Sequence, residues 1–218
     1  KSVSGYDKTR TLLTDELIAE GIIVHFEDDV KLVSSEIIHQ PSDVLVVWTP
    51  AIPKDHSELK FFQKSNYRIK KRSEVLGMIT KQTFTIAVAG THGKTTTSSL
   101  IAHILKSSGV DCTAFLGGIT QNYGTNLLLS EKLKALKKNQ KIKPITVVEA
   151  DEYDRSFLTL YPDIAVITSV DADHLDIYGD QKQMEKSYTQ FANQLKTGGV
   201  LIVKKGVDKI LILEKREK

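Results

Sequence analysis

The sequence has few of the features that mark secreted or membrane proteins. It contains a single cysteine, Cys112, among 218 residues, so an intramolecular disulfide is impossible. No apolar run approaches the roughly 20 residues that a membrane-spanning helix needs. The first residues also lack the pattern of a secretory signal. We therefore expect a cytoplasmic protein that does not enter a membrane.

A strong charge of either sign is lacking as well. Lys and Arg together number 30 and Asp and Glu 27, which leaves a formal net charge of +3. That excess is too small to indicate binding to nucleic acid or to a membrane surface by electrostatics alone. Hydrophobic residues make up 40% of the chain, which is enough for a proper core. We expect no nucleic-acid partner, and nothing in the sequence requires a protein partner.

Apolar runs alternate with amphipathic stretches along the chain. The runs at 43–53, 84–90, 144–152, 163–176 and 198–203 predict strands, the first two of them buried. Helical spacing predicts helices at 11–21, 57–66, 72–82, 94–109 and 181–196. This alternation predicts an α/β fold with a mainly parallel sheet. The polar stretch near residue 81 predicts a domain boundary there.

The strongest chemical signal is "AVAGTHGKTTT" (87–97). A phosphate-binding loop normally reads G-x-x-x-x-G-K-[ST], yet Val88 stands where its first glycine belongs, and the first glycine is Gly90. The order of a buried strand, a glycine turn and a helix from Lys94 is nevertheless the one that phosphate binding requires. Lys94 supplies a mobile positive charge, and the Thr95 hydroxyl supplies a ligand for Mg²⁺. The alternative is a structural turn with an incidental lysine.

Acidic residues follow two further predicted strands. Ligands of open α/β sheets bind at the carboxyl ends of the strands, so we expect these residues on the edge that carries the loop. Carboxylate and phosphate oxygens are the ligands that Mg²⁺ usually takes, and the sequence therefore predicts a magnesium–ATP site. Each carboxylate has the alternative of capping a helix or facing water. The residues are Glu149, Asp151, Glu152 and Asp154 after one strand, and Asp171, Asp173, His174 and Asp176 after the other.

Two histidines lie within these segments. His174, between two aspartates, is either a metal ligand through its neutral imidazole or a packing residue, and its spacing alone leaves both open. His92 lies inside the loop, where it shapes the backbone or touches phosphate, and we do not interpret it as a catalytic base.

Taken together, these segments resemble the motifs of the Mur ligases. The stretches "AVAGTHGKTTT", "EADEYDRSFL" and "DADHLDIYG" match three motifs of that family in order, and the shortened loop is the family's normal form. The earlier stretches "SGYDKTRTLLTDELIAEGI", "WTPAIPKDH" and "RSEVLG" are similar to the family's N-terminal domain. The resemblance covers essentially the whole chain and favours the alanine-adding branch.

The resemblance implies an ATP-dependent ligase of peptidoglycan synthesis with UDP-N-acetylmuramate and L-alanine as substrates. ATP would phosphorylate the carboxylate of the sugar nucleotide to an acyl phosphate, and the alanine amino group would then displace phosphate to form an amide. Bringing two anions together requires charge neutralisation and in-line positioning.

The resemblance also implies roles for individual residues. Lys94 would contact the β- and γ-phosphates, and Glu149 and His174 would act beside it in catalysis. The ligands of magnesium would be Thr95, Glu149 and His174. The ATP-contacting residues would be Gly90, Thr91, His92, Gly93, Lys94, Thr95 and Thr96.

The domain organisation implied by the resemblance is a partial one. Residues 1–81 would be part of a Rossmann-like N-terminal domain that binds the UDP substrate, and residues 82–218 part of the central ATP-binding domain. The family's third domain, which completes the ATP site and reads the amine, has no counterpart in the chain. Two alternatives stay open: a salvage ligase that adds a whole peptide to the same sugar nucleotide, and a non-catalytic nucleotide-binding module.

We predict that the 218-residue chain by itself shows no ligase turnover, because the domain expected to complete the site is not within it. The measurement is phosphate release with ATP, UDP-N-acetylmuramate and L-alanine. Release that depends on ATP and alanine would contradict the prediction.

Overall fold

The chain forms two compact units. The computed structural model describes residues 2–134, 143–171 and 175–213, and its contacts divide the chain into Lys1–Arg72 and Ser73–Lys218. This division falls at the start of helix α4 (Arg72–Gln82), whereas the domain boundary expected near residue 81 falls at the end of the same helix. The assignment of 1–81 and 82–218 as domains stays a prediction. Among the described residues, no helix combines the length and apolar character that crossing a bilayer requires.

The first unit contains two small parallel sheets, β1 paired with β2 and β3 paired with β4. Helix α1 begins where the sequence predicts, because Thr11 and Thr14 form a reciprocal capping box. The elements are β1 (Ser4–Tyr6), α1 (Leu12–Ala19), β2 (Ile23–His25), α2 (Ser35–His39), β3 (Leu45–Trp48), α3 (Ser57–Lys64) and β4 (Arg68–Lys71).

Strand β3 is shorter and less buried than the sequence predicts for the run at 43–53. Leu45 and Val47 are 38% and 47% exposed, whereas the alternate residues Val46 and Trp48 are half-buried. A continuous apolar run predicts a strand covered on both faces, but in this structure one face of β3 stays accessible. The predicted strand is confirmed, and its predicted burial is wrong.

The start of helix α3 is tied to the loop after β2. Asp28 accepts hydrogen bonds from the backbone N–H of Ser57 at 2.9 and 3.0 Å and from that of Glu58 at 3.3 Å. Burial alone would raise the pKa of Asp28, but the hydrogen bonds from Ser57 and Glu58 outweigh it and lower the pKa. His25 Nε2 lies 2.6 Å from Glu58 Oε1, which adds a second tie between the same segments.

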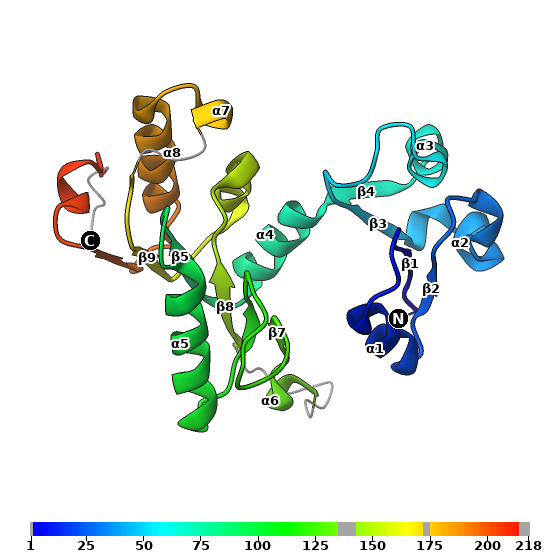
Figure 1. Ribbon diagram of the computed structural model, residues 1–218, viewed down its shortest axis with the longest axis horizontal. Helices are drawn as coiled ribbons and strands as arrows, with labels where there is room; N and C mark the ends of the chain where they lie inside the picture. Colours follow the sequence, from blue (N-terminus) through cyan, green and yellow to red (C-terminus); the bar gives the residue numbers. More distant parts are fainter. Residues whose placement is uncertain (1, 135–142, 172–174, 214–218) are drawn as a thin grey trace. The chain divides into compact units, whose positions relative to one another are not determined.

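The second unit is built on one six-stranded sheet with the order β10-β9-β5-β8-β6-β7 (Figure 1). Only the edge pair β6–β7 is antiparallel, so the predicted mainly parallel α/β sheet is confirmed. The elements are α4, β5 (Phe84–Ala89), α5 (Lys94–Ser107), β6 (Thr113–Phe115), β7 (Leu127–Leu128), α6 (Glu131–Lys134), β8 (Ile145–Glu149), the 3-10 helix η3 (Tyr153–Thr159), β9 (Ile164–Ile167), α7 (Leu175–Tyr178), α8 (Gln181–Asn193) and β10 (Val200–Val203).

Alternate strand residues enter two separate hydrophobic clusters. In β8, Val147 packs in the cluster that contains Ala102 of α5, whereas Val148 packs in the cluster that contains Tyr188 of α8. This period of two is what a strand covered on both faces requires. Figure 1 shows α5 in green and α8 in orange beside the strands of this unit.

Helix α5 buries small residues against the sheet. Ser98 and Ala102 are its buried positions, while Leu100 and Ile104 are 56% and 62% exposed. Helical spacing predicts the helix correctly, but only some of its apolar residues face the core: Ile101 and Leu105 pack against the cluster around Ala102.

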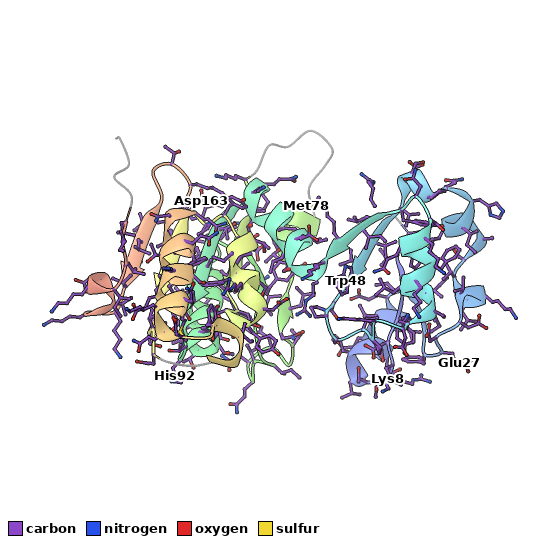
Figure 2. All side chains as sticks on the ribbon, turned by 90° about the horizontal axis from the view of Figure 1, so that it is seen from above. Lys8, Glu27, Trp48, Met78, His92 and Asp163 are labelled. Carbon is purple, nitrogen blue, oxygen red and sulfur yellow. The ribbon has the colours of Figure 1, made fainter. Side chains whose placement is uncertain are left out.

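Asp163 ties together the end of the sheet where β5 and β9 begin. Its carboxylate accepts from Lys196 Nζ at 2.7 Å and from the backbone N–H of Thr85 at 2.8 Å. Burial would raise the pKa of Asp163, but the hydrogen bonds from Lys196 and Thr85 outweigh burial and lower it. Figure 2 shows Asp163 and His92 at opposite ends of this unit.

We predict that Asp163→Asn lowers the free energy of unfolding at pH 7 by about 1–3 kcal/mol, the usual effect of losing a charged hydrogen-bond partner. Because the folded pKa is depressed, the carboxylate stabilises the fold above its unfolded pKa of about 3.9 and loses this effect as pH falls through the folded value. Urea unfolding at pH 7 and in strong acid measures this. A difference between wild type and variant that does not shrink in acid would contradict the assignment.

Candidate phosphate-binding site

The glycines of the loop between β5 and α5 are required by its geometry. Gly90 has φ of 134°, and a Cβ there would lie 2.0 Å from the Thr168 hydroxyl oxygen. Gly93, at φ of 79°, is the residue before the first turn of α5. A left-handed backbone and close packing both favour glycine. The shortened motif therefore forms a strand–turn–helix with α5 starting at Lys94, as the sequence predicts, and the helix N-terminus favours an anion.

The end of β9 holds the loop from one side. Thr91 Oγ1 lies 2.8 Å from Ser169 Oγ, and the backbone N–H of Thr91 donates to the Ser169 carbonyl at 3.2 Å. The backbone N–H of His92 donates to Ser169 Oγ at 3.0 Å, and Thr168 Oγ1 donates to the His92 carbonyl at 2.5 Å. His92 thus shapes the loop through its main chain. The sequence predicts this for His92 as one alternative, but it does not predict the roles of Thr168 and Ser169.

Asp171 lies on this side of the loop too. Its carboxylate accepts from Thr91 Oγ1 at 3.4 Å, and its backbone N–H donates to the same hydroxyl at 3.1 Å. The prediction that an acidic residue after β9 reaches the loop is confirmed for Asp171.

Glu149 lies at the end of β8, against the first turn of α5. It accepts from Thr95 Oγ1 at 2.9 Å, from the backbone N–H of Gly117 at 2.8 Å and from Ser98 Oγ at 3.5 Å. The structure therefore brings Glu149 and Thr95 together. Carboxylate and hydroxyl oxygens side by side fit a hard cation such as Mg²⁺.

Glu152 and Gly117, to which the sequence alone assigns no particular role, each make a close contact at this site. Lys94 Nζ lies 2.7 Å from the Gly90 carbonyl and 2.9 and 2.8 Å from the two carboxylate oxygens of Glu152. A Cβ on Gly117 would lie 2.2 Å from Glu149 Oε1. The pair "GG" after a short apolar run is the one sequence signal that marks this close approach.

The remaining sequence-predicted residues are placed only in part. His174 and Asp173 lie outside the described residues, so the role of His174 as a metal ligand stays a prediction. Thr96 is exposed in the first turn of α5. Asp151 accepts from the backbone N–H of Tyr153 at 3.0 Å, which shapes its own turn. Within the described ranges, no group of three or more His, Cys, Asp or Glu side chains is arranged to hold a metal ion.

Fold and site together define a mainly parallel α/β protein with a short glycine loop, of the type that can bind phosphate, between a central strand and a helix. Residues 88–217 match the model of the Mur ligase middle domain, and residues 1–84 match the model described as "Mur ligase family, catalytic domain". The chain belongs to the Mur ligase family.

Among curated proteins, the chain is 53% identical over 207 residues to the UDP-N-acetylmuramate–L-alanine ligase of Flavobacterium psychrophilum, covering 95% of this chain and 43% of that protein. The chain thus spans less than half the length of this relative.

Two solved structures share the fold. The UDP-N-acetylmuramate–alanine ligase of Thermotoga maritima matches with a TM-score of 0.75 at 24% identity, over 94% of this chain and 44% of that one. The UDP-N-acetylmuramate:L-alanyl-gamma-D-glutamyl-meso-diaminopimelate ligase of Neisseria meningitidis matches with a TM-score of 0.76 at 22% identity, over 95% and 66%.

We predict that Gly117→Ala weakens the binding of Mg²⁺–nucleotide about tenfold or more, the usual effect of disturbing a residue that orients a metal ligand. The new Cβ would displace the Glu149 carboxylate from Thr95. Gly118→Ala is the matched control, because a Cβ there meets only the methyl group of Thr95, at an ordinary 3.5 Å. Calorimetric titration with ADP and Mg²⁺ measures both, and equal affinities for the two variants would contradict the prediction.

Proposed function

We propose that this chain is part of an ATP-dependent ligase that joins L-alanine to UDP-N-acetylmuramate. The observation that carries the proposal is the convergence of Lys94, Thr95 and Glu149 at one edge of a parallel sheet. A phosphate loop next to a carboxylate and a hydroxyl is suited to ATP with magnesium. The names of the curated relatives support the substrate pair.

The proposed reaction has two steps. The γ-phosphoryl group passes from ATP to the carboxylate of UDP-N-acetylmuramate, and ADP leaves. The alanine amino group then attacks the acyl carbon, expels inorganic phosphate and loses a proton, which leaves an amide. The loop 90–93, Lys94 and the first turn of α5 bind the phosphates of ATP in this scheme.

Charge is the main obstacle to the first step. Two unit charges 4 Å apart repel by about 4 kcal/mol at an effective dielectric constant of about 20, and both reactants are anions. Lys94 and the positive end of α5 offset part of this repulsion. Thr95 and Glu149 would hold Mg²⁺, with His174 as the further ligand, and the ion would supply additional charge neutralisation.

The remaining assignments follow from the same proposal. Residues 1–81 form part of the domain that binds the UDP substrate, and residues 82–218 form part of the ATP-binding domain. The enzyme works in the cytoplasm, where ATP is available, and it requires no protein partner.

We predict that the complete protein containing this chain releases phosphate only when ATP, Mg²⁺, UDP-N-acetylmuramate and L-alanine are all present. Glu149→Ala should lower kcat about 100-fold or more, the usual effect of removing one electrostatic stabiliser of a transition state. Glu185→Ala on α8, an acidic residue whose side chain accepts from Gln181, serves as the control and should keep full activity.

Two results would overturn this proposal. A Glu149→Ala enzyme with full activity would show that catalysis does not depend on this carboxylate, and the mechanism proposed here would be wrong. A complete enzyme that accepts a tripeptide and rejects L-alanine would indicate the salvage ligase.

A further inference from the structure

The lysine of the phosphate loop forms an ion pair with a carboxylate that is almost fully buried. The side chain of Glu152 is 1% exposed and that of Lys94 14% exposed, and Lys94 Nζ lies within 2.9 Å of both carboxylate oxygens. The pair joins the first turn of α5 to the segment after β8, which are 58 residues apart in the sequence.

The segment that carries Glu152 is fixed by its own contacts. The Tyr178 hydroxyl donates to the main-chain carbonyl of Glu152 at 2.7 Å. Burial raises the pKa of Tyr178 to about 12, and the charge of Glu152 adds to this, so the hydroxyl keeps its proton at neutral pH. The Arg155 guanidinium lies over the ring of Tyr178, 5.4 Å from its centroid. The carboxylate of Glu152 is therefore held in place beside the loop.

This arrangement limits what the lysine offers to a ligand. An ammonium group has three N–H donors, and the Gly90 carbonyl and the Glu152 carboxylate are its partners in this structure. A phosphate that draws Nζ of Lys94 away from Glu152 must offset the loss of this ion pair with a buried carboxylate, which is unfavourable. The positive charge of the loop is thus largely neutralised before a ligand arrives.

We propose that Glu152 limits the affinity of the phosphate loop for its ligands, because it competes with phosphate for Nζ of Lys94. The proposal rests on the function proposed above, in which this loop binds ATP. Inorganic phosphate has too few contacts to offset the loss of the ion pair. A magnesium nucleotide gains further contacts from the loop backbone, the N-terminus of α5 and the oxygens of Thr95 and Glu149.

The test compares binding of two probes, ADP with Mg²⁺ and inorganic phosphate, to the complete protein by calorimetric titration. Glu152→Gln keeps the size of the side chain and removes its charge. We expect this variant to bind ADP with Mg²⁺ about tenfold tighter or more, because Nζ of Lys94 no longer has to leave a buried carboxylate in order to contact phosphate. We also expect it to bind inorganic phosphate measurably tighter than wild type.

Two controls separate competition for Lys94 from a general effect of charge or stability. Asp163→Asn removes another largely buried carboxylate paired with a lysine, at the opposite end of the sheet, and should leave both affinities unchanged. In a Lys94→Met background, Glu152→Gln should give at most a small part of its gain, because the lysine for which phosphate competes is gone.

The outcomes distinguish this proposal from the proposed function. If the wild-type protein does not bind ADP with Mg²⁺, the proposed function fails. If wild type binds but Glu152→Gln binds equally or more weakly, or gains as much without Lys94, the competition proposed here is overturned. If circular dichroism shows that Glu152→Gln does not fold, the same titrations are made with Glu152→Asp. Its shorter side chain holds Nζ less closely, so tighter binding is again expected and unchanged or weaker binding overturns the proposal.

Discussion

The parallel pairing of β5 with both β8 and β9 is the constraint on which the site depends. Val88 stands opposite Glu149 in one register, and Ala89 stands opposite Ile167 in the other. Because all three strands run the same way, their carboxyl ends meet at one edge. The loop after β5 therefore lies between Glu149 on one side and the segment after β9 on the other.

The charged groups Lys94 and Glu149 at this edge each have partners of opposite character. Lys94 pairs with Glu152, while Glu149 accepts from a hydroxyl and a backbone N–H. A buried unpaired charge would be too costly, and these groups satisfy one another's charges within the protein. A ligand must therefore replace existing interactions and does not enter a set of free groups. This makes binding depend on how many contacts a ligand offers at once.

The two sides of the loop differ in what they contribute. The β9 side uses hydroxyl and backbone groups of Thr168 and Ser169, with the Asp171 carboxylate beside Thr91, and these contacts fix the loop's shape. The β8 side contributes the negatively charged carboxylates of Glu149 and Glu152. Glycine is needed at both contacts, since Gly90 packs against Thr168 and Gly117 against Glu149 with no room for a Cβ. A rigid loop and an oriented carboxylate are what transfer of a phosphoryl group requires.

The α/β class, the strand–turn–helix around Gly90 and Lys94, and the place of the acidic residues after β8 at the edge that carries the loop could all be predicted from the residues alone, whereas the pairing of Glu149 with Thr95 was implied only by the family resemblance. The first three follow from apolar periodicity and from the rule that parallel strands end at one edge, both of which are local patterns plus one topological principle. Only the tertiary structure decided the partners of individual side chains. Nothing in "EADEYDR" distinguishes Glu152, which pairs with Lys94, from Asp151, which shapes its own turn. The sequence also did not predict that Leu100 and Val47 are exposed. The exposure of a residue depends on which elements pack against it, and contacts between segments far apart in the chain determine that.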